Sequence, residues 1–308
     1  MASHSNSLTG LVAATFTPFD KDGEVNLSVI GDYVDYLVKK QEVRSVFVNG
    51  TSGEGLSLSV EERKQLAAEW VKQGKNKLDH VIIHVGSMSL KESQELAAHA
   101  AEIKADGIAV ISPFFLKPRS SEGLVLFIQK IASAAPALPL YYYHIPELTG
   151  VKVLAEDVLD EIMGKVPTFQ GLKYSSSDLL DFGRCVNKYK NSLSLLYGKD
   201  EELLGGLVLG ASGAIGSTYN YLGWWNNKML DSFHQSKYEE AKNQQYTVQE
   251  FVSFAYKLGF GIPENKSVMS WYSGIPMGPP RLPLMPCAKE NGDLLTKKMK
   301  DLKLWPVP

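Results

Sequence analysis

The sequence has few cysteines, no long apolar run and no excess of charge of either sign. Cys185 and Cys287 are its only cysteines, too few for a disulfide framework, so we expect both thiols to be reduced. No apolar run approaches the roughly 18 residues that a membrane span needs. Residues 1–9 are polar and lack the apolar core of a secretion signal. These absences predict a cytoplasmic protein with no membrane partner.

The balance of charged residues and the placement of histidines exclude further classes. Lys and Arg number 32 and Asp and Glu 34, a net charge of -2, and no basic run is interleaved with aromatics, so we expect no nucleic-acid partner. The six histidines form no ligand cluster, and no Gly-x-Gly-x-x-Gly follows the first apolar run. We therefore expect neither a metal nor a dinucleotide or other cofactor.

Short β-branched runs alternate with longer helical patterns through about two-thirds of the chain. Eight runs are predicted as strands: 11–15, 45–49, 81–85, 107–112, 140–144, 168–173, 194–197 and 213–215. Two capping signatures, Ser59 with Glu62 and Ser89 with Glu92, open the second and third of the intervening helices. Eight strand–helix units with continuous apolar strands predict an α/β fold. They favour a closed (β/α)₈ TIM barrel over an open doubly wound sheet.

The rhythm changes after the eighth unit, where helical patterns follow one another over 238–257, 265–272 and 289–302 without a strand between them. We therefore predict a (β/α)₈ barrel over 8–236 and a C-terminal helical region over 237–308 that packs on the barrel. Four prolines within 274–284 exclude regular structure there. This segment is interpreted as a packed connector, with a peptide-recognition motif as the alternative.

Residues that act in a (β/α)₈ barrel lie at the C-terminal ends of the strands, which directs the search for a site. The sixth strand ends at Lys173 and the fifth at Tyr143 and His144. Taking an ammonium group out of water favours its neutral form, and a neutral amine can attack a carbonyl. A tyrosine hydroxyl can transfer a proton. A solvated strand-end lysine and a core tyrosine are the alternatives.

The loop after the second strand, Asn49–Gly55, places Thr51 and Ser52 between glycines, so that backbone N–H groups can converge on a carboxylate or phosphate. An ordinary tight turn would use the same residues. Likewise, Asp200 and Glu201 after the seventh strand could be acids at a helix N-terminus. Together, an amine, a proton donor and a carboxylate cradle suit Schiff-base chemistry on a 2-oxo acid.

Three motifs carry a family resemblance over nearly the whole chain: Gly50–Glu54, Tyr143–Pro146 and Gly171–Ser175. They resemble the N-acetylneuraminate lyase / dihydrodipicolinate synthase family of class I aldolases. The resemblance implies a (β/α)₈ barrel with C-terminal helices that assembles as a homotetramer. It also implies that Lys173 forms a Schiff base with pyruvate, that Tyr143 donates the proton, and that Thr51 and Ser52 bind the pyruvate carboxylate.

One position separates the branches of this family. Synthases that condense pyruvate with aspartate semialdehyde carry an arginine two residues after the Tyr-x-x-Pro motif, where this sequence has Leu148. A leucine cannot make the bidentate contact of an arginine with a carboxylate. The sequence around these motifs resembles the vertebrate lyase branch, and this resemblance implies reversible cleavage of N-acetylneuraminate to N-acetylmannosamine and pyruvate. In that branch the sugar would be held by Ser175, Gly198, Asp200, Glu201 and Ser217.

Two alternatives remain open at this point. The first is a related pyruvate-dependent aldolase such as dihydrodipicolinate synthase, and the second is a barrel that binds sialic acid or pyruvate without turnover. The second alternative stays open because the sequence departs from the family at one position. Much of the family places a tyrosine from a neighbouring subunit in the proton relay, and Phe115 occupies the corresponding position here. Phenylalanine has no exchangeable proton, so that relay is not carried over.

Overall fold

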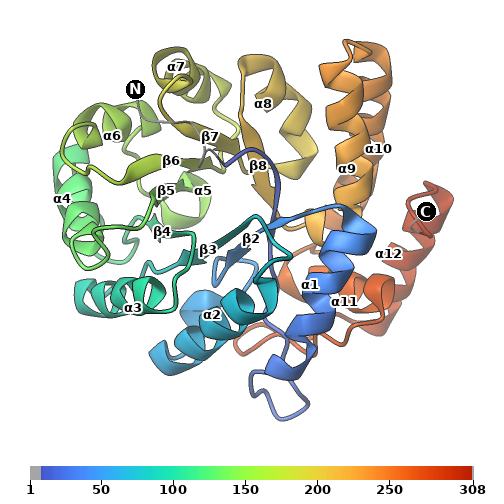
Figure 1. The fold of residues 1–308 in the computed structure, drawn as a ribbon. Coiled ribbons are helices and arrows are strands. Elements are labelled where there is room, and N and C mark those ends of the chain that lie inside the picture. The colour runs from blue at the N-terminus through green and yellow to red at the C-terminus, as the bar shows by residue number, and fades with distance from the viewer. Residues whose placement is uncertain (1–7, 307–308) are drawn as a thin grey trace. The chain divides into compact units, whose positions relative to one another are not determined.

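A computed structural model of the chain describes residues 8–306, so the polar stretch 1–7 and residues 307–308 lie outside it. Its eight parallel strands follow chain order in a closed barrel (Figure 1). They are β1 Gly10–Ala14, β2 Ser45–Val48, β3 His80–His84, β4 Gly107–Ile111, β5 Leu140–His144, β6 Phe169–Tyr174, β7 Ser194–Tyr197 and β8 Gly213–Gly216. The predicted barrel is confirmed, and each predicted strand begins and ends within one residue of the observed one.

Helices follow the strands as the capping signals predict. They are α1 Ile30–Tyr36, α2 Val60–Gly74, α3 Leu90–Glu102, α4 Ser121–Ala132, α5 Pro146–Thr149, α6 Ala155–Ile162, α7 Leu179–Tyr189, α8 Leu203–Leu209 and α9 Tyr219–His234. The capping box of α2 is present: Ser59 Oγ accepts from the Glu62 N–H (3.2 Å), and Glu62 Oε2 accepts from the Ser59 N–H (2.7 Å). The one-turn helix α5 was not predicted; Pro146 opens it and left-handed Gly150 ends it.

The chain divides into two compact units. The first, residues 8–10 and 80–215 of the described part, holds strands β3 to β8 and helices α3 to α8. Within it, α3, α4, α6 and α7 lie outside the strands (Figure 1). Neighbouring strands pair in parallel, and the register of β5 against β6 sets Tyr143 opposite Lys173.

The second unit, residues 11–79 and 216–306 of the described part, holds strands β1 and β2, helices α1 and α2, and the C-terminal helices. Beyond α9 these are α10 Tyr238–Tyr256, α11 Ile262–Ser273 and α12 Lys289–Asp301, which confirms the predicted helical extension. Its boundary at residue 237 stays a prediction. In residues 8–306 no helix is both long and apolar enough to cross a membrane.

The proline-rich segment between α11 and α12 forms neither helix nor strand, as predicted. It packs against the start of the unit: the Phe19 N–H donates to the Met277 carbonyl oxygen (2.9 Å). Gly278 is left-handed (φ 68°), and a side chain there would collide with the Phe19 carbonyl oxygen. These contacts support the interpretation as a packed connector.

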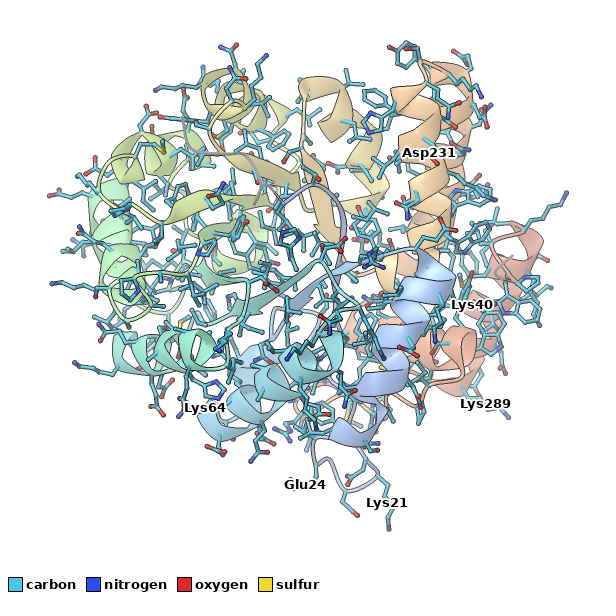
Figure 2. The ribbon with its side chains drawn as sticks, viewed as in Figure 1. Lys21, Glu24, Lys40, Lys64, Asp231 and Lys289 are labelled. Carbon is cyan, nitrogen blue, oxygen red and sulfur yellow. The ribbon has the colours of Figure 1, made fainter. Side chains whose placement is uncertain are left out.

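Charged side chains such as Lys21, Lys40 and Asp231 point away from the ribbon (Figure 2).

Candidate active site

Lys173 and Tyr143 lie side by side on adjacent strands of the first unit. They are register partners on β6 and β5, so their side chains leave the same face of the sheet. Lys173 Nζ lies 4.0 Å from the centre of the Tyr143 ring. Both side chains are buried, with Lys173 4% exposed and Tyr143 3% exposed. The alternative of a solvated strand-end lysine is therefore wrong.

His84, the last residue of β3, is a neighbour of Tyr143 that the sequence did not indicate as part of the site. The two ring centres are 6.1 Å apart at an interplanar angle of 87°, an edge-to-face contact. The His84 side chain is buried. Its position at a strand end was the available signal, since these ends lie at one edge of a barrel. The contact restricts the plane of the Tyr143 ring.

Ser175 and Gly198 are brought together at the ends of β6 and β7. Ser175 Oγ donates to the Gly198 carbonyl oxygen (3.3 Å), and the Gly198 N–H donates to the Tyr174 carbonyl oxygen (2.7 Å). A β-carbon at position 198 would collide with Ser175 Oγ and lie 2.9 Å from the Tyr174 carbonyl oxygen. A glycine is therefore required for this close approach.

The predicted acids Asp200 and Glu201 begin the short 3₁₀ turn Asp200–Glu202 that leads into α8. Asp200 is buried and Glu201 half-buried, both in the same unit as Lys173. The next residue, Glu202, accepts hydrogen bonds from the Tyr197 hydroxyl (2.9 Å) and the Ser177 hydroxyl (2.7 Å).

Glu202 also pairs with the amine of Lys199 at 3.1 Å. Burial raises the pKa of Glu202, but the hydrogen bonds from Ser177, Tyr197 and Lys199 outweigh burial and hold this pKa below its ordinary value. Glu202 is thus an anchor of the turn that the sequence did not indicate.

Thr51, Ser52 and Ser217 belong to the second unit. Thr51 is exposed, and Ser52 and Ser217 are half-buried. The turn that carries Thr51 and Ser52 is closed by a hydrogen bond from the Glu54 N–H to the Thr51 carbonyl oxygen (3.0 Å). The Thr17 hydroxyl donates to the Gly53 carbonyl oxygen (2.5 Å). The roles of Thr51, Ser52 and Ser217 beside Lys173 remain predictions.

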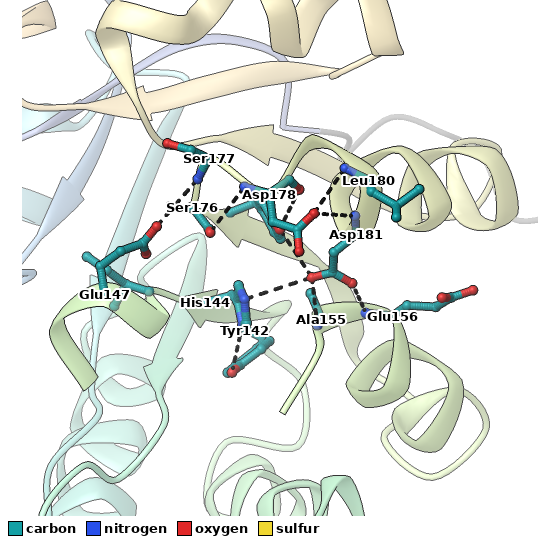
Figure 3. Close-up of polar contacts among 12 residues, drawn as sticks. Tyr142, His144, Glu147, Ala155, Glu156, Ser176, Ser177, Asp178, Leu180 and Asp181 are labelled. Carbon is teal, nitrogen blue, oxygen red and sulfur yellow. Dashed lines mark hydrogen bonds and ion pairs between the residues drawn. The ribbon is translucent and has the colours of Figure 1, made fainter. Parts of the chain in front are cut away.

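A buried network on the other face of β5 and β6 is built around Asp181 of α7 (Figure 3). Its carboxylate accepts from the backbone N–H groups of Ala155 (3.0 Å) and Glu156 (3.1 Å), which open α6, and from the Tyr174 hydroxyl (3.1 Å). The α6 N-cap residue, Leu154, supplies no such bond itself. Asp181 therefore caps a helix that the local sequence leaves uncapped.

His144 connects this network to β5. Its ring stacks on Tyr174 (5.1 Å between ring centres, 20°), its Nδ1 lies 3.3 Å from the Tyr142 hydroxyl, and its Nε2 lies 4.0 Å from Asp181 Oδ2. Burial lowers the pKa of His144 to about 4, although the Asp181 charge acts in the opposite direction. The imidazole is therefore neutral at pH 7. Because His144 and Tyr174 follow Tyr143 and Lys173 directly, their stacking supports the register of the two catalytic candidates.

No group of three or more His, Cys, Asp or Glu side chains in the described part of the chain could hold a metal ion, and we assign no metal ligand. The chemistry that the arrangement offers is that of an amine and a phenol held together in a buried site. Such a pair can form an imine with a carbonyl compound and transfer a proton next to it.

Comparison with known proteins places the chain among enzymes that fit this chemistry. The model of the dihydrodipicolinate synthetase family matches residues 7–302. The N-acetylneuraminate lyase of Homo sapiens is 60% identical over 98% of this chain and 95% of its own length, and that of Danio rerio is 55% identical over 97% and 98%. A solved N-acetylneuraminate lyase from Aliivibrio salmonicida has a TM-score of 0.92 and 36% identity, covering 97% of this chain and 98% of its own.

A second solved structure, the N-acetylneuraminate lyase of Proteus mirabilis, also has a TM-score of 0.92, with 34% identity over 97% of this chain and 100% of its own. The family match, the identity with vertebrate relatives and the barrel agree over nearly the full length. They confirm the resemblance carried by the three sequence motifs. The chain therefore belongs to the dihydrodipicolinate synthetase family.

Proposed function

We propose that this protein is an N-acetylneuraminate lyase, a class I aldolase that reversibly cleaves N-acetylneuraminate to N-acetylmannosamine and pyruvate. The observation that carries the proposal is the buried pair of Lys173 and Tyr143, with the amine 4.0 Å from the ring centre. The 55–60% identity to vertebrate N-acetylneuraminate lyases over nearly the whole chain supports the choice of substrate.

Lys173 is the proposed nucleophile. Its neutral amine attacks the ketone carbon of the open-chain substrate, and loss of water gives a protonated imine, the Schiff base. The cationic nitrogen withdraws electrons, so the carbon–carbon bond one position away can break and leave an enamine. Protonation of the enamine and hydrolysis of the imine then release pyruvate and restore the amine. The burial of Lys173 beside Tyr143 supports this role because it holds the amine in one place next to a proton-transfer group.

Tyr143 is the proposed proton-transfer group. In cleavage it takes up the hydroxyl proton of the sugar as the carbon–carbon bond breaks, while its own phenolic proton passes through the relay to the enamine carbon; in the synthetic direction both transfers are reversed. Phe115, at the position where much of the family has a relay tyrosine, is 82% exposed and carries no exchangeable proton. The proposed relay therefore runs through Tyr143, with Thr51 and the substrate carboxylate.

The remaining predicted residues bind the two ends of the substrate in this proposal. Thr51 and Ser52 hold the pyruvate carboxylate through the backbone and hydroxyl groups of their turn. The sugar tail is held by Ser175, Gly198, Asp200, Glu201 and Ser217. The hydrogen bond between Ser175 and Gly198 supports a shared role for the ends of β6 and β7.

Leu148 separates this function from dihydrodipicolinate synthesis. It lies in the one-turn helix α5 and is 66% exposed, so an apolar side chain is presented where the synthases carry an arginine. The test is to assay the purified protein with N-acetylneuraminate and, separately, with pyruvate and aspartate semialdehyde. We expect cleavage of the sugar acid and no turnover of the semialdehyde. Rapid turnover of the semialdehyde, or recovery of unchanged N-acetylneuraminate after long incubation, would contradict the proposal.

We further propose that the protein works in the cytoplasm as a homotetramer without metal or cofactor. The family resemblance supports the assembly. Cys185 is buried and Cys287 half-buried, and both are free thiols, which supports a reducing compartment. Light scattering of the purified protein tests the assembly, and a monomer mass at micromolar concentration would contradict it.

A further inference from the structure

A buried ion pair ties the Thr51–Ser52 turn to the C-terminal helices. Glu54, three residues after Thr51, pairs with Lys266 of α11 at 2.9 Å between Oε1 and Nζ, and each side chain is 1% exposed. The other carboxylate oxygen, Oε2, accepts from the Arg281 backbone N–H at 2.7 Å. Both oxygens of Glu54 are thus bound by residues more than 200 positions away in the chain.

The cations of this cluster are held in turn by the proline-rich connector and by Phe19. Lys266 Nζ donates to the Pro279 carbonyl oxygen (3.0 Å) and lies 4.2 Å from the centre of the Phe19 ring. Burial lowers the pKa of Lys266, and the charge of Glu54 opposes this shift. The ammonium group therefore depends on Glu54 as its charge partner.

Arg281 also lies over the Phe19 ring, with its guanidinium carbon 4.7 Å from the ring centre. Its two terminal nitrogens bind the Glu62 carboxylate at 2.6 and 2.8 Å. This bidentate pair fixes the guanidinium in one geometry. It thereby places the Arg281 backbone N–H that binds Glu54.

The backbone of the turn itself needs such support. Asn49 and Glu54, which flank the turn, both have left-handed conformations (φ 62° and 53°) that non-glycine residues seldom adopt. Such conformations persist where surrounding contacts hold them. Glu54 is held by its side chain through Lys266 and Arg281, and its N–H closes the turn onto Thr51.

We propose that Glu54, Lys266 and Arg281 are positioning residues that hold the Thr51–Ser52 turn in the conformation that binds the pyruvate carboxylate. The C-terminal helical region would then take part in substrate binding without touching the substrate. This inference rests on the proposed function, since it assigns pyruvate to that turn. A turn that is already ordered before pyruvate binds costs less free energy to order on binding. A buried ion pair adds little stability compared with apolar residues of similar size, so we assign this one to positioning the turn rather than to stabilising the fold.

The test measures pyruvate binding through borohydride trapping of the Schiff base over a range of pyruvate concentrations. The variants are Glu54→Gln, the double variant Glu54→Gln/Lys266→Met, and the control Glu250→Gln. Glu250 pairs with Lys298 at 2.5 Å on the exposed side of α10, so the control loses an ion pair of the same unit. The double variant removes both buried charges and keeps an apolar chain on Phe19, which guards against loss of folding. Circular dichroism verifies the fold of each variant.

We expect the half-saturating pyruvate concentration to rise about tenfold or more in Glu54→Gln and in the double variant, with the trapped fraction at saturation unchanged. The half-saturating pyruvate concentration of the control Glu250→Gln should stay within about twofold of the wild type. In all three variants the KM for N-acetylmannosamine should also stay within about twofold of the wild type. A folded double variant with wild-type half-saturation, or one that only loses trapped fraction, would overturn the inference and leave the proposed function intact. A wild type that traps no pyruvate would overturn both.

Discussion

The amine of Lys173 lies 4.0 Å from the centre of the Tyr143 ring because the two residues are register partners on neighbouring parallel strands. A nucleophile and a phenol are thereby fixed relative to each other by the hydrogen bonds of the sheet. Strands hold side chains more precisely than loops do, and near-attack geometry depends on such precision. The two groups can nevertheless be separated by mutation, since each has its own step in the proposed reaction.

Tyr143→Phe removes the hydroxyl and keeps the ring beside Lys173. We therefore expect the Schiff base with pyruvate to form normally while kcat for N-acetylneuraminate cleavage falls about 10²- to 10⁴-fold. Steady-state kinetics and borohydride trapping measure the two effects separately. Tyr141→Phe, two residues earlier on the same face of β5, is the control and should keep near-normal kcat. Near-normal kcat in Tyr143→Phe would remove Tyr143 as the proton donor.

Gly198→Ala places a β-carbon against Ser175 Oγ and within 2.9 Å of the Tyr174 carbonyl oxygen. Ser175 must move, so we expect KM for N-acetylneuraminate to rise about tenfold or more, with pyruvate trapping little changed. Gly205→Ala in α8 is the matched control, because a β-carbon there has no neighbour within 4 Å. Unchanged KM in a folded Gly198→Ala protein would show that Ser175 and Gly198 do not bind the sugar.

Asp181→Asn weakens the cap that α7 supplies to α6, because an amide nitrogen cannot accept the Ala155 or Glu156 N–H. We expect a loss of about 2–3 kcal/mol in the free energy of unfolding, the cost of leaving a buried donor unpaired. Urea denaturation measures it. Asp160→Asn, which removes an exposed partner of Lys188, should cost less than about 1 kcal/mol. Equal losses for the two variants would contradict the capping role of Asp181.

The lowered pKa of the buried His144 leads us to expect that the stability of the protein depends on pH. Its pKa is about 4 in the folded protein against an ordinary value of 6.5, so between these values the unfolded state binds more protons. Stability should therefore be full above about pH 6.5 and fall as the pH drops toward 4, by about 2 kcal/mol between pH 7 and pH 5. Carboxylates with lowered pKa values, such as Glu62 at about 2, lose their contribution only at lower pH.

Urea denaturation of the wild type and of His144→Gln at several pH values checks this dependence. The comparison concerns the slope between pH 7 and pH 5, which should flatten in the variant even if its absolute stability is lower. His234→Gln, which removes an exposed histidine at the end of α9, should keep the wild-type slope. Parallel curves for the wild type and His144→Gln would assign the dependence to other groups.

The barrel and its strands could be predicted from the sequence because a strand that is covered on both faces is a continuous apolar run. The polar residues on either side of such a run show where the strand begins and ends. Leu140–His144 was predicted to the residue. The helix α5 was missed because four residues are too few for a helical period to be visible. Only Pro146 and Gly150 marked its two ends.

The family and the positions of Lys173 and Tyr143 also followed from sequence motifs, but the contacts that hold the site did not. Lys266 and Glu54 are 212 residues apart, and no local pattern relates them. Asp181 caps a helix of another segment, and His84 meets Tyr143 only through the sheet. Such long-range polar contacts depend on the tertiary structure and leave no periodic signal in the sequence.

Borohydride trapping tests most directly whether Lys173 forms the Schiff base. The purified protein is incubated with pyruvate, or with N-acetylneuraminate, then reduced, digested and examined by mass spectrometry. We expect a reduced pyruvyl adduct on the peptide that contains Lys173, with either compound. An adduct found only on another lysine, or no adduct while the sugar acid is cleaved at a normal rate, would contradict it.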